Sequence, residues 1–283
     1  MKDLKDKVAV ITGAGSGIGL ALAIQCAQEG MKVVLADIDE KFLRRAQRRV
    51  KRIGAPNLTV LTDVSKANDI ETLAKKTIDT FGAVHLLFNN AAVSNTKYTW
   101  NYTLNDWKWQ LGVNLFGVIH GVSTFVPIMI KQDTECHVIN ISSIEGLFSG
   151  SGPGGAIYGI SKHGIMSLSE TLRRELELKH PKVKVSVVCP GGVITRIWYG
   201  DIHRPEDYQN DPNEIIEDSK IEELYKNYPN GFEESPPISP EKAADIIFQG
   251  IKEDAFYILT HKDQFLRSIV KERFDNILDA FDS

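Results

Sequence analysis

Tyr158 and Lys162 are the residues whose types and spacing most directly suggest chemistry, because they lie four positions apart. On a helix this spacing places two side chains on one face and within reach of each other. A tyrosine has an ordinary pKa near ~10 and is a poor base at neutral pH, but a nearby ammonium group favours the phenolate and lowers that pKa. Such a pair can move the hydroxyl proton when a hydride leaves a carbinol carbon. Pairs with this spacing also occur by chance on helix surfaces, so the surrounding elements decide their meaning.

The surrounding elements alternate between short apolar runs and longer stretches with helical spacing. The apolar runs lie at 8–11, 33–36, 58–61, 86–88, 137–141, 183–188 and 256–259. Near-continuous apolar strands separated by helices indicate a parallel sheet covered on both faces. With right-handed crossovers, this pattern predicts an α/β fold with a doubly wound, mostly parallel sheet (a Rossmann fold), in a single domain over 1–283. Tyr158 and Lys162 open the helix after the fifth strand, which favours a functional role for them.

A glycine-rich turn follows the first apolar run directly, with the sequence Thr12-Gly13-Ala14-Gly15-Ser16-Gly17-Ile18-Gly19. Glycines in such a turn let the backbone approach a pyrophosphate, and the amino end of the following helix supplies free N–H groups and a partial positive charge. The position between the first strand and the first helix makes the turn a dinucleotide-binding signature. It is not a P-loop, because no Gly-Lys-Ser or Gly-Lys-Thr follows.

Asp37 ends the second apolar run, eighteen residues after Gly19. A carboxylate at this position accepts hydrogen bonds from an adenosine ribose diol and repels a 2′-phosphate. Neither Ser16 nor Ile38 carries a positive charge that would offset the repulsion. We therefore expect NAD(H) to be favoured, with NADP(H) still possible. The alternative for Asp37 is a solvated acid at a strand end or a cap of the following helix.

The alternation breaks between 195 and 240, a segment too long for an ordinary connection. From Asp201 to Glu234 it holds eleven acidic residues and three Lys or Arg. It leaves the carboxyl end of the sixth apolar run, where open α/β sheets bind ligands. We expect 196–240 to form a substrate-binding lid, the alternative being an acidic linker.

The composition is that of an ordinary globular protein, with 283 residues, 42% of them hydrophobic, and a formal net charge of -4. The acidic balance argues against nucleic-acid binding and against a membrane-surface site. Cys26, Cys136 and Cys189 have no zinc-site spacing, so we expect reduced core thiols and no metal. The charged first residues do not resemble a signal peptide, and polar residues interrupt the apolar stretches. We expect a cytoplasmic protein without a transmembrane span.

Together these motifs resemble the short-chain dehydrogenase/reductase family, in its single-domain NAD(P)-dependent branch. The resemblance extends from Lys7 to about Thr195 and rests on the glycine spacing and further motifs in the same order. The further motifs are Asp63-Val64, Asn89-Asn90-Ala91-Ala92, Asn114, Ser142-Ser143, Tyr158-x-x-x-Lys162 and Pro190-Gly191-Gly192-Val193-Ile194-Thr195. Two features depart from the family pattern. Ala92 stands where the family commonly has glycine, and Ser143 lies fifteen positions before Tyr158, a longer gap than usual. Either Ser142 or Ser143 could therefore face the substrate, and the surrounding sequence favours Ser143.

The resemblance implies a role for each matching residue. Tyr158 would be the general acid/base, and Lys162 would lower its pKa and bind the nicotinamide ribose. Ser143 would hydrogen-bond the substrate oxygen, and Asn114 would hold a water that links Lys162 to solvent. The implied cofactor-binding residues are Gly13, Ser16, Gly17, Ile18, Gly19, Asp37, Asp63, Val64, Asn90, Ala91, Tyr158, Lys162, Pro190, Gly191, Val193 and Thr195.

The expected reaction is hydride transfer between NAD(H) and a small secondary alcohol or ketone. Besides Ser143 and Tyr158, the candidate substrate-binding residues are Glu145, Phe148, Trp198 and Tyr199. Glu145 could bind a cationic or hydroxylated substrate, or it could be a solvated loop acid. The alternative functions are a non-catalytic dinucleotide-binding protein and a different reaction on the same fold, such as imine reduction.

Two long stretches, 105–130 and 156–178, are apolar on more than one face and are expected to form buried helices. Such helices could be buried against a second copy of the chain. The family resemblance implies an oligomer as well, so we expect a homodimer or homotetramer.

Overall fold

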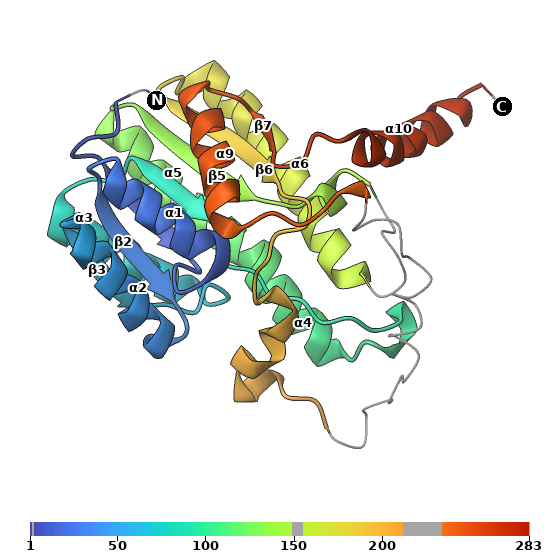
Figure 1. Cartoon of the computed structure of the whole chain (residues 1–283), viewed down its shortest axis with the longest axis horizontal. Helices are drawn as coiled ribbons and strands as arrows, with labels where there is room; N and C mark the ends of the chain where they lie inside the picture. Colours follow the sequence, from blue (N-terminus) through green and yellow to red (C-terminus); the bar gives the residue numbers. More distant parts are fainter. Residues whose placement is uncertain (2, 149–154, 212–233, 283) are drawn as a thin grey trace.

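The computed structural model describes residues 1, 3–148, 155–211 and 234–282, and a seven-stranded sheet forms its core (Figure 1). The strand order is β3-β2-β1-β4-β5-β6-β7, and every neighbouring pair is parallel. The strands are β1 (Val8–Thr12), β2 (Lys32–Asp37), β3 (Asn57–Leu61), β4 (Leu86–Asn89), β5 (Cys136–Ile141), β6 (Val183–Cys189) and β7 (Tyr257–Leu259). The order reverses between β1 and β4, which confirms the doubly wound sheet predicted from the sequence.

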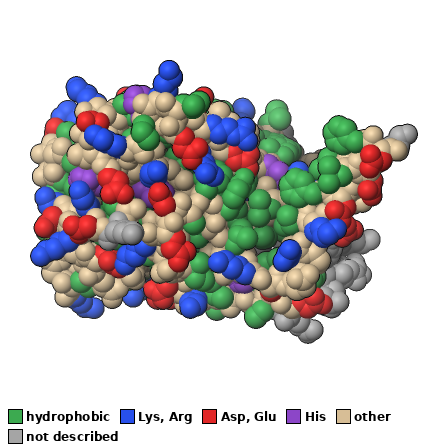
Figure 2. All heavy atoms as spheres, turned by 90° about the horizontal axis from the view of Figure 1, so that it is seen from above, with side chains coloured by type: hydrophobic (Ala, Val, Ile, Leu, Met, Phe, Trp, Pro, Cys, Tyr) green, Lys and Arg blue, Asp and Glu red, His purple; other side chains and the backbone are tan. Residues whose placement is uncertain are grey.

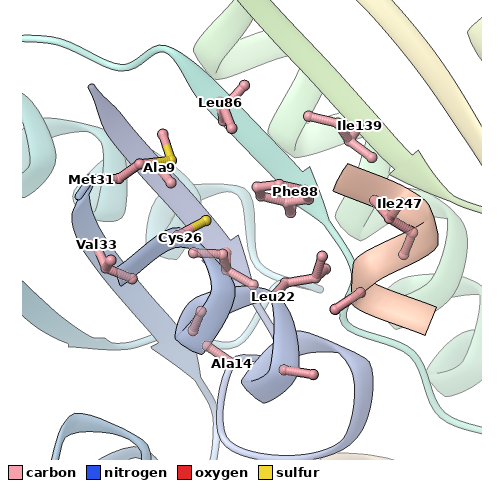
Figure 3. Packing of buried hydrophobic residues seen from close by; sticks show 14 of the residues in the cluster. Ala9, Ala14, Leu22, Cys26, Met31, Val33, Leu86, Phe88, Ile139 and Ile247 are labelled. Carbon is pink, nitrogen blue, oxygen red and sulfur yellow. The ribbon is translucent and has the colours of Figure 1, made fainter. Parts of the chain in front are cut away.

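Helices cover both faces of this sheet and bury its apolar strands (Figure 1). Figure 3 shows one layer, in which Leu22 of the first helix and Ile247 lie near Phe88 of β4. Each large apolar side chain buried in this way stabilises the fold by roughly 1.5–3 kcal/mol. One face carries α1 (Gly17–Gln28), α2 (Glu40–Ile53) and α9 (Pro240–Lys252), and the other carries α3 (Ala67–Phe81), α5 (Gly117–Gln132) and α6 (Ala156–Lys179).

Local signals in the sequence fix where several helices begin and end. The Asp39 side chain caps α2 by accepting a hydrogen bond from the Phe42 backbone N–H at 2.9 Å. Gly54 ends the same helix with a φ of 91°, a left-handed conformation that favours glycine. Ser239 caps α9, and Pro240 occupies its first position, where a missing N–H costs nothing.

The apolar stretch before β5 is interrupted, whereas the sequence suggested one continuous helix. α4 (Leu104–Leu111) and α5 flank a five-residue π-helical turn, η2 (Gly112–Phe116). Such turns occur mostly at functional sites, and this one carries Asn114. By length and composition alone, the helical stretch Leu104–Gln132 could cross a membrane, because an 18-residue window within it has a mean hydropathy of 1.7. A buried core helix of a globular protein has the same length and composition. In the fold, the stretch packs against β4, α3 and α6 in the second core layer.

The lid segment, 196–240, leaves the sheet after β6 and returns at α9. Its two ends lie side by side, because Ile194 N donates to Ile238 O and Ile238 N donates to Gly192 O, both at 3.0 Å. Two short 3-10 helices, η4 (Ile197–His203) and η5 (Glu206–Tyr208), follow the first end. Residues 212–233 of the lid segment, and 149–154 before α6, lie outside the described residues.

A buried carboxylate fastens the lid segment to α4. Asp106 is fully buried, and it accepts hydrogen bonds from Arg204 Nη1 at 2.8 Å and from Lys97 Nζ at 2.7 Å. The Arg204 guanidinium also lies 5.0 Å from the Trp109 ring. Burial alone would raise the pKa of Asp106, but hydrogen bonds from Lys97, the Thr103 backbone and Arg204 hold that pKa well below its usual value. We call Lys97, Asp106 and Arg204 the lid anchor.

The three cysteines, Cys26, Cys136 and Cys189, are free and buried in the core, as expected from the sequence. Burial raises the pKa of the Cys189 thiol to about 12 and that of Cys26 further still. These thiols are therefore protonated at neutral pH and act as small apolar side chains.

The last helix, α10 (Gln264–Asp279), projects from the body of the fold (Figure 1). Arg273 Nη1 donates to Leu147 O at 2.8 Å, so the helix touches the loop after β5. Figure 2 shows hydrophobic side chains gathered where this helix meets the body. Phe274 and Leu278 of α10 are among the exposed large apolar residues.

Candidate active site

A cavity of about 520 Å³ opens at the carboxyl ends of the strands. Open α/β sheets bind ligands at this edge, where the strand order reverses. Most residues predicted from the sequence line it, namely Gly13, Ser16, Gly17, Ile18, Asp37, Asp63, Val64, Asn90, Ala91, Ser143, Glu145, Tyr158, Lys162, Pro190, Gly191, Val193 and Thr195. Gly19 and Asn114 lie behind the lining. Trp198 and Tyr199 belong to η4, and their side chains lie outside the described part of the chain.

The turn between β1 and α1 is compact because its glycines let backbone segments meet closely. Gly13 and Gly17 have positive φ values of 65° and 52°, which favour glycine. A Cβ placed on Gly19 would lie 2.1 Å from the Gly13 carbonyl oxygen. Gly19 therefore lets α1 pack onto the turn and is not among the residues that line the cavity, and its expected cofactor contact stays a prediction. At these glycines, the turn between β1 and α1 presents backbone atoms, and no side chains, to a ligand.

Thr12, to which the sequence assigned no role of its own, ties this turn to the end of β4. Its hydroxyl donates to Phe88 O at 3.2 Å and accepts from Asn90 N at 2.9 Å. The Asn90 side-chain amide donates in turn to Thr12 O at 2.9 Å. Asn90 lines the cavity as predicted, but its amide holds the turn in shape.

Asp37 lies at the end of β2, with its carboxylate against the turn. Oδ2 accepts from Gly15 N at 2.8 Å, and Oδ1 accepts from Asp39 N at 3.0 Å. Burial raises the pKa of Asp37, although these two backbone hydrogen bonds oppose the rise. An ionised carboxylate has about four lone-pair sites, so two donors leave capacity for a ribose diol. The glycine turn and Asp37 together fit a dinucleotide cofactor.

Lys162 and Tyr158 lie on the first turns of α6, as their spacing predicted. Lys162 is only 2% exposed, and its Nζ lies 5.3 Å from the centre of the Tyr158 ring. Within the described part of the chain, Ile141 O is the one hydrogen-bond acceptor of this ammonium, at 3.0 Å. Burial lowers the pKa of Lys162 from 10.5 to about 8, against partial compensation from the Glu145 charge.

The pKa of Tyr158 moves in the direction opposite to the one expected from the sequence. Burial raises it, the negative charge of Glu145 raises it further, and a hydrogen bond with Ser143 lowers it only in part. The expected lowering by Lys162 is not among the causes of this shift; its ammonium lies 5.3 Å from the centre of the ring and donates to Ile141 O. At neutral pH the protein alone therefore holds Tyr158 as a neutral phenol, which is a proton donor.

The two serines after β5 have different partners. The Ser142 hydroxyl donates to the Lys162 backbone carbonyl at 2.8 Å, so it fastens α6 to the strand end. The Ser143 side chain hydrogen-bonds Tyr158 and accepts from Glu145 N at 3.2 Å. Ser143 is therefore the serine whose hydroxyl faces the tyrosine.

Asn114 is fully buried in the π-helical turn, so its side-chain amide needs hydrogen-bond partners within the protein. The backbone of Val93 provides them. Its Oδ1 accepts from Val93 N at 2.8 Å, and its Nδ2 donates to Val93 O at 2.9 Å. Ser161 Oγ lies 3.4 Å from the same Nδ2, which links Asn114 to the residue before Lys162. This geometry brings Asn114 behind α6, the helix that carries Tyr158 and Lys162, and fixes the loop after β4.

The substrate side is less completely described than the cofactor side. Glu145 lines the cavity as predicted, and a Cβ placed on Gly155 would lie 3.4 Å from its Oε2. Phe148 is buried and is not among the described residues that line the cavity, so its expected place in the substrate pocket stays a prediction. Within the described residues, no group of His, Cys, Asp and Glu could hold a metal ion.

Several lining residues were missed by sequence reasoning. They are contributed by α2, α4 and the lid segment, and include Phe42, Trp109, Arg196 and His203. Only Arg196 had a local signal, because it follows Thr195 at the end of the last motif. The others reach the cavity through tertiary packing.

Comparisons with known proteins agree with this geometry. Residues 7–203 match the family model described as short chain dehydrogenase. A CLA biosynthesis dehydrogenase/reductase of Lactiplantibacillus plantarum is 32% identical over 283 residues, covering 98% of this chain and 95% of that protein. A C alpha-dehydrogenase of Sphingobium sp. is 32% identical over 281 residues, covering 99% of this chain and 88% of that protein. A crystal structure of a short chain dehydrogenase/reductase from Burkholderia phymatum in complex with NAD has a TM-score of 0.90 and 39% identity, covering 98% of this chain and 96% of that chain.

Proposed function

We propose that this chain, which belongs to the short-chain dehydrogenase/reductase family, transfers a hydride between NAD(H) and a secondary alcohol or ketone. Membership makes it an NAD(P)-dependent oxidoreductase acting on CH–OH groups, and the finer assignment is ours. The observation that carries it is the convergence of Ser143, Tyr158 and Lys162 on the cavity that the glycine turn also lines.

Tyr158 is the general acid/base in this proposal. During reduction its phenol donates a proton to the carbonyl oxygen, and during oxidation it accepts the proton of the substrate hydroxyl. The raised pKa of Tyr158 keeps the phenol protonated at neutral pH, which is the form that reduction requires, but it also makes the phenol a weaker acid than a free tyrosine. When bound, NAD(H) would supply or accept the hydride, and its oxidised form would bring a positive charge to the site.

The neighbours of Tyr158 have supporting roles. Ser143 hydrogen-bonds the substrate oxygen, since its hydroxyl faces the tyrosine whereas that of Ser142 faces the α6 backbone. Lys162 binds the nicotinamide ribose through Nζ and adds positive charge near the phenolate. Asn114 holds a water that connects Lys162 with solvent, and its buried position behind α6 supports this role.

The proposed cofactor is NAD(H), because the Asp37 carboxylate would repel a 2′-phosphate and accept from a ribose diol. NADP(H) stays the alternative. The relative of known structure in complex with NAD supports the choice. Asp63 and Val64 would contact adenine, Ile18 would approach the pyrophosphate, and Val193 and Thr195 would contact the carboxamide. Asn90 and Ala91 would lie along the middle of the cofactor, with Pro190 and Gly191 beneath nicotinamide.

The substrate is proposed to be a small molecule enclosed by the lid segment, in a single-domain protein. Trp198 and Tyr199 come from that segment, and Glu145 offers a carboxylate to a cationic or hydroxylated group. We further propose a cytoplasmic homodimer or homotetramer. The exposed apolar residues Phe116 at the start of α5 and Ile160 on α6 support contact between copies.

The decisive experiment pairs a panel of secondary alcohols and ketones with the variant Tyr158→Phe. We expect turnover by the wild type, and a loss of kcat of about 10²- to 10⁴-fold in the variant, because the proton donor is gone. Fluorescence titration, with NADPH for comparison, should show that the variant still binds NADH. Turnover retained by Tyr158→Phe would refute its role. NADH binding without turnover on any alcohol, ketone or imine would instead favour a non-catalytic dinucleotide-binding protein.

A further inference from the structure

Arg196 lies close to the glycine turn through two neighbours that pack on that turn, Thr195 and Phe42. A Cβ placed on Gly17 would lie 3.1 Å from Cγ2 of Thr195, the residue before Arg196. A Cβ placed on Gly15 would lie 2.8 Å from Cβ of Phe42. The Arg196 guanidinium carbon lies 4.7 Å from the centre of that same Phe42 ring. The guanidinium is therefore held over a side chain that packs directly on the turn.

Arg196 is also the cation that could bind a ligand at the end of the cavity formed by the glycine turn. Among the described residues that line it, Lys162 and Arg196 are the only Lys or Arg. Lys162 is committed to the other end, where it donates to Ile141 O beside Tyr158. Arg196 is exposed and forms no ion pair with any described carboxylate. His203 lies 3.5 Å from Asp39, which directs that ring toward a carboxylate already present.

The amino end of α1 provides only about half a positive charge, whereas a pyrophosphate carries two negative charges. A guanidinium can supply further positive charge to the pyrophosphate. Its planar donors also match two phosphate oxygens at once. The Asp37 carboxylate lies on the ribose side of the turn and repels a further phosphate there. These charges favour the bridging pyrophosphate over a 2′-phosphate as the partner of Arg196.

We infer that Arg196 is a cofactor-binding residue, which pairs with the pyrophosphate of a nucleoside diphosphate and so closes the first turn of the lid segment over the bound dinucleotide. The inference rests on the proposed function, because it presupposes that a dinucleotide occupies the glycine turn. Phe42 holds the guanidinium in place through a cation–π contact. The lid segment thus contacts cofactor as well as substrate.

The test is calorimetric titration of the full chain with ADP-ribose, NADH and adenosine. Arg196→Ala should weaken ADP-ribose and NADH binding by roughly 10- to 100-fold, the range for a charge-assisted contact. Adenosine binding, which involves no phosphate, should be unchanged. Wild-type binding of ADP-ribose should weaken with added salt, and this dependence should be smaller in the variant. Arg196→Lys should recover part of the lost affinity.

Arg45→Ala is the matched control, because Arg45 also lies near the Phe42 ring, at 5.9 Å, but does not line the cavity. It should bind ADP-ribose as the wild type does. Unchanged ADP-ribose binding in Arg196→Ala would overturn the inference, as would an equal loss of adenosine binding, which would indicate displaced packing. A loss confined to NADPH would assign Arg196 to a 2′-phosphate instead. Failure of the wild type to bind any dinucleotide would overturn the proposed function together with this inference.

Discussion

Two groups of buried charged side chains in the described part of the chain, the lid anchor and the active site, differ in how completely their charges are paired. In the lid anchor, the buried Asp106 meets two cations, Lys97 and Arg204, and its pKa is held well below the usual value. In the active site, the buried Lys162 has a backbone carbonyl as its acceptor, and its pKa falls to about 8. A fully paired charge fixes position, since changing its protonation breaks several contacts. An incompletely paired charge destabilises the fold but remains responsive to a ligand.

The largest expected effect comes from breaking the paired group with Asp106→Asn. The variant leaves two cations facing a neutral amide, one of them in Arg204, which is almost fully buried. We expect the free energy of unfolding to fall by about 3–5 kcal/mol, as for other broken buried pairs. Urea denaturation measures this loss. Asp201→Asn is the control, because Asp201 pairs with the same arginine from an exposed position, and it should cost below about 1 kcal/mol. Equal losses would contradict the contrast.

A somewhat smaller effect, of opposite sign, is expected from Lys162→Met. Lys162 has a lower pKa in the folded chain than its ordinary 10.5, so the unfolded chain binds more protons between about pH 8 and 10.5. Stability therefore rises with pH across this window. Above pH 10 the raised pKa of Tyr158 acts the other way, because the unfolded tyrosine loses its proton first. The window in which Lys162 dominates is about pH 8 to 10.

Removing the buried ammonium should make the folded chain more stable at neutral pH, by up to roughly 3 kcal/mol, and should flatten the rise above pH 8. Turnover should be lost in the same variant. Urea denaturation at a series of pH values checks the first effect, with Lys76→Met, an exposed position on α3, as the control. A variant less stable than the wild type at neutral pH would show that Lys162 is better paired than the geometry indicates.

The smallest expected change in stability distinguishes Ser142 from Ser143, the two serines after β5. Ser142→Ala removes a buried hydrogen bond to the Lys162 carbonyl and should cost roughly 1 kcal/mol of stability. Ser143→Ala should change stability less but lower kcat by about 10²-fold, because it removes a donor to the substrate oxygen. Thermal denaturation and steady-state kinetics on both variants provide the measurement. The reverse pattern would assign the substrate contact to Ser142.

The difference between the two groups also explains what could be predicted from the sequence. The strands, the glycine turn and the Tyr158–Lys162 pair depend on neighbours within a few positions, so apolar runs and spacing predict them. The lid anchor joins Asp106 to a residue 98 positions away, and no local pattern marks such a contact. Phe42 and Arg196 meet in the same non-local way.

The direction of the Tyr158 pKa was mispredicted for a related reason. Spacing identifies the ammonium partner, but only the folded chain shows how much water both groups lose and that Lys162 donates to Ile141. The packing role of Gly19 is also visible only in the folded chain, where a Cβ would meet the Gly13 carbonyl oxygen. Residue types predict which groups react, whereas burial determines their protonation.

The two hydrogen bonds that pair Ile238 with Gly192 and Ile194 have a consequence for how such a chain can evolve. They hold both ends of the lid segment together at its base. The entropy of closing a loop grows only slowly with its length, so doubling the segment would cost about 0.6 kcal/mol. Insertions and deletions within it would hardly affect the sheet. Relatives could therefore diverge in the molecules they accept while inheriting an unchanged apparatus for the redox step.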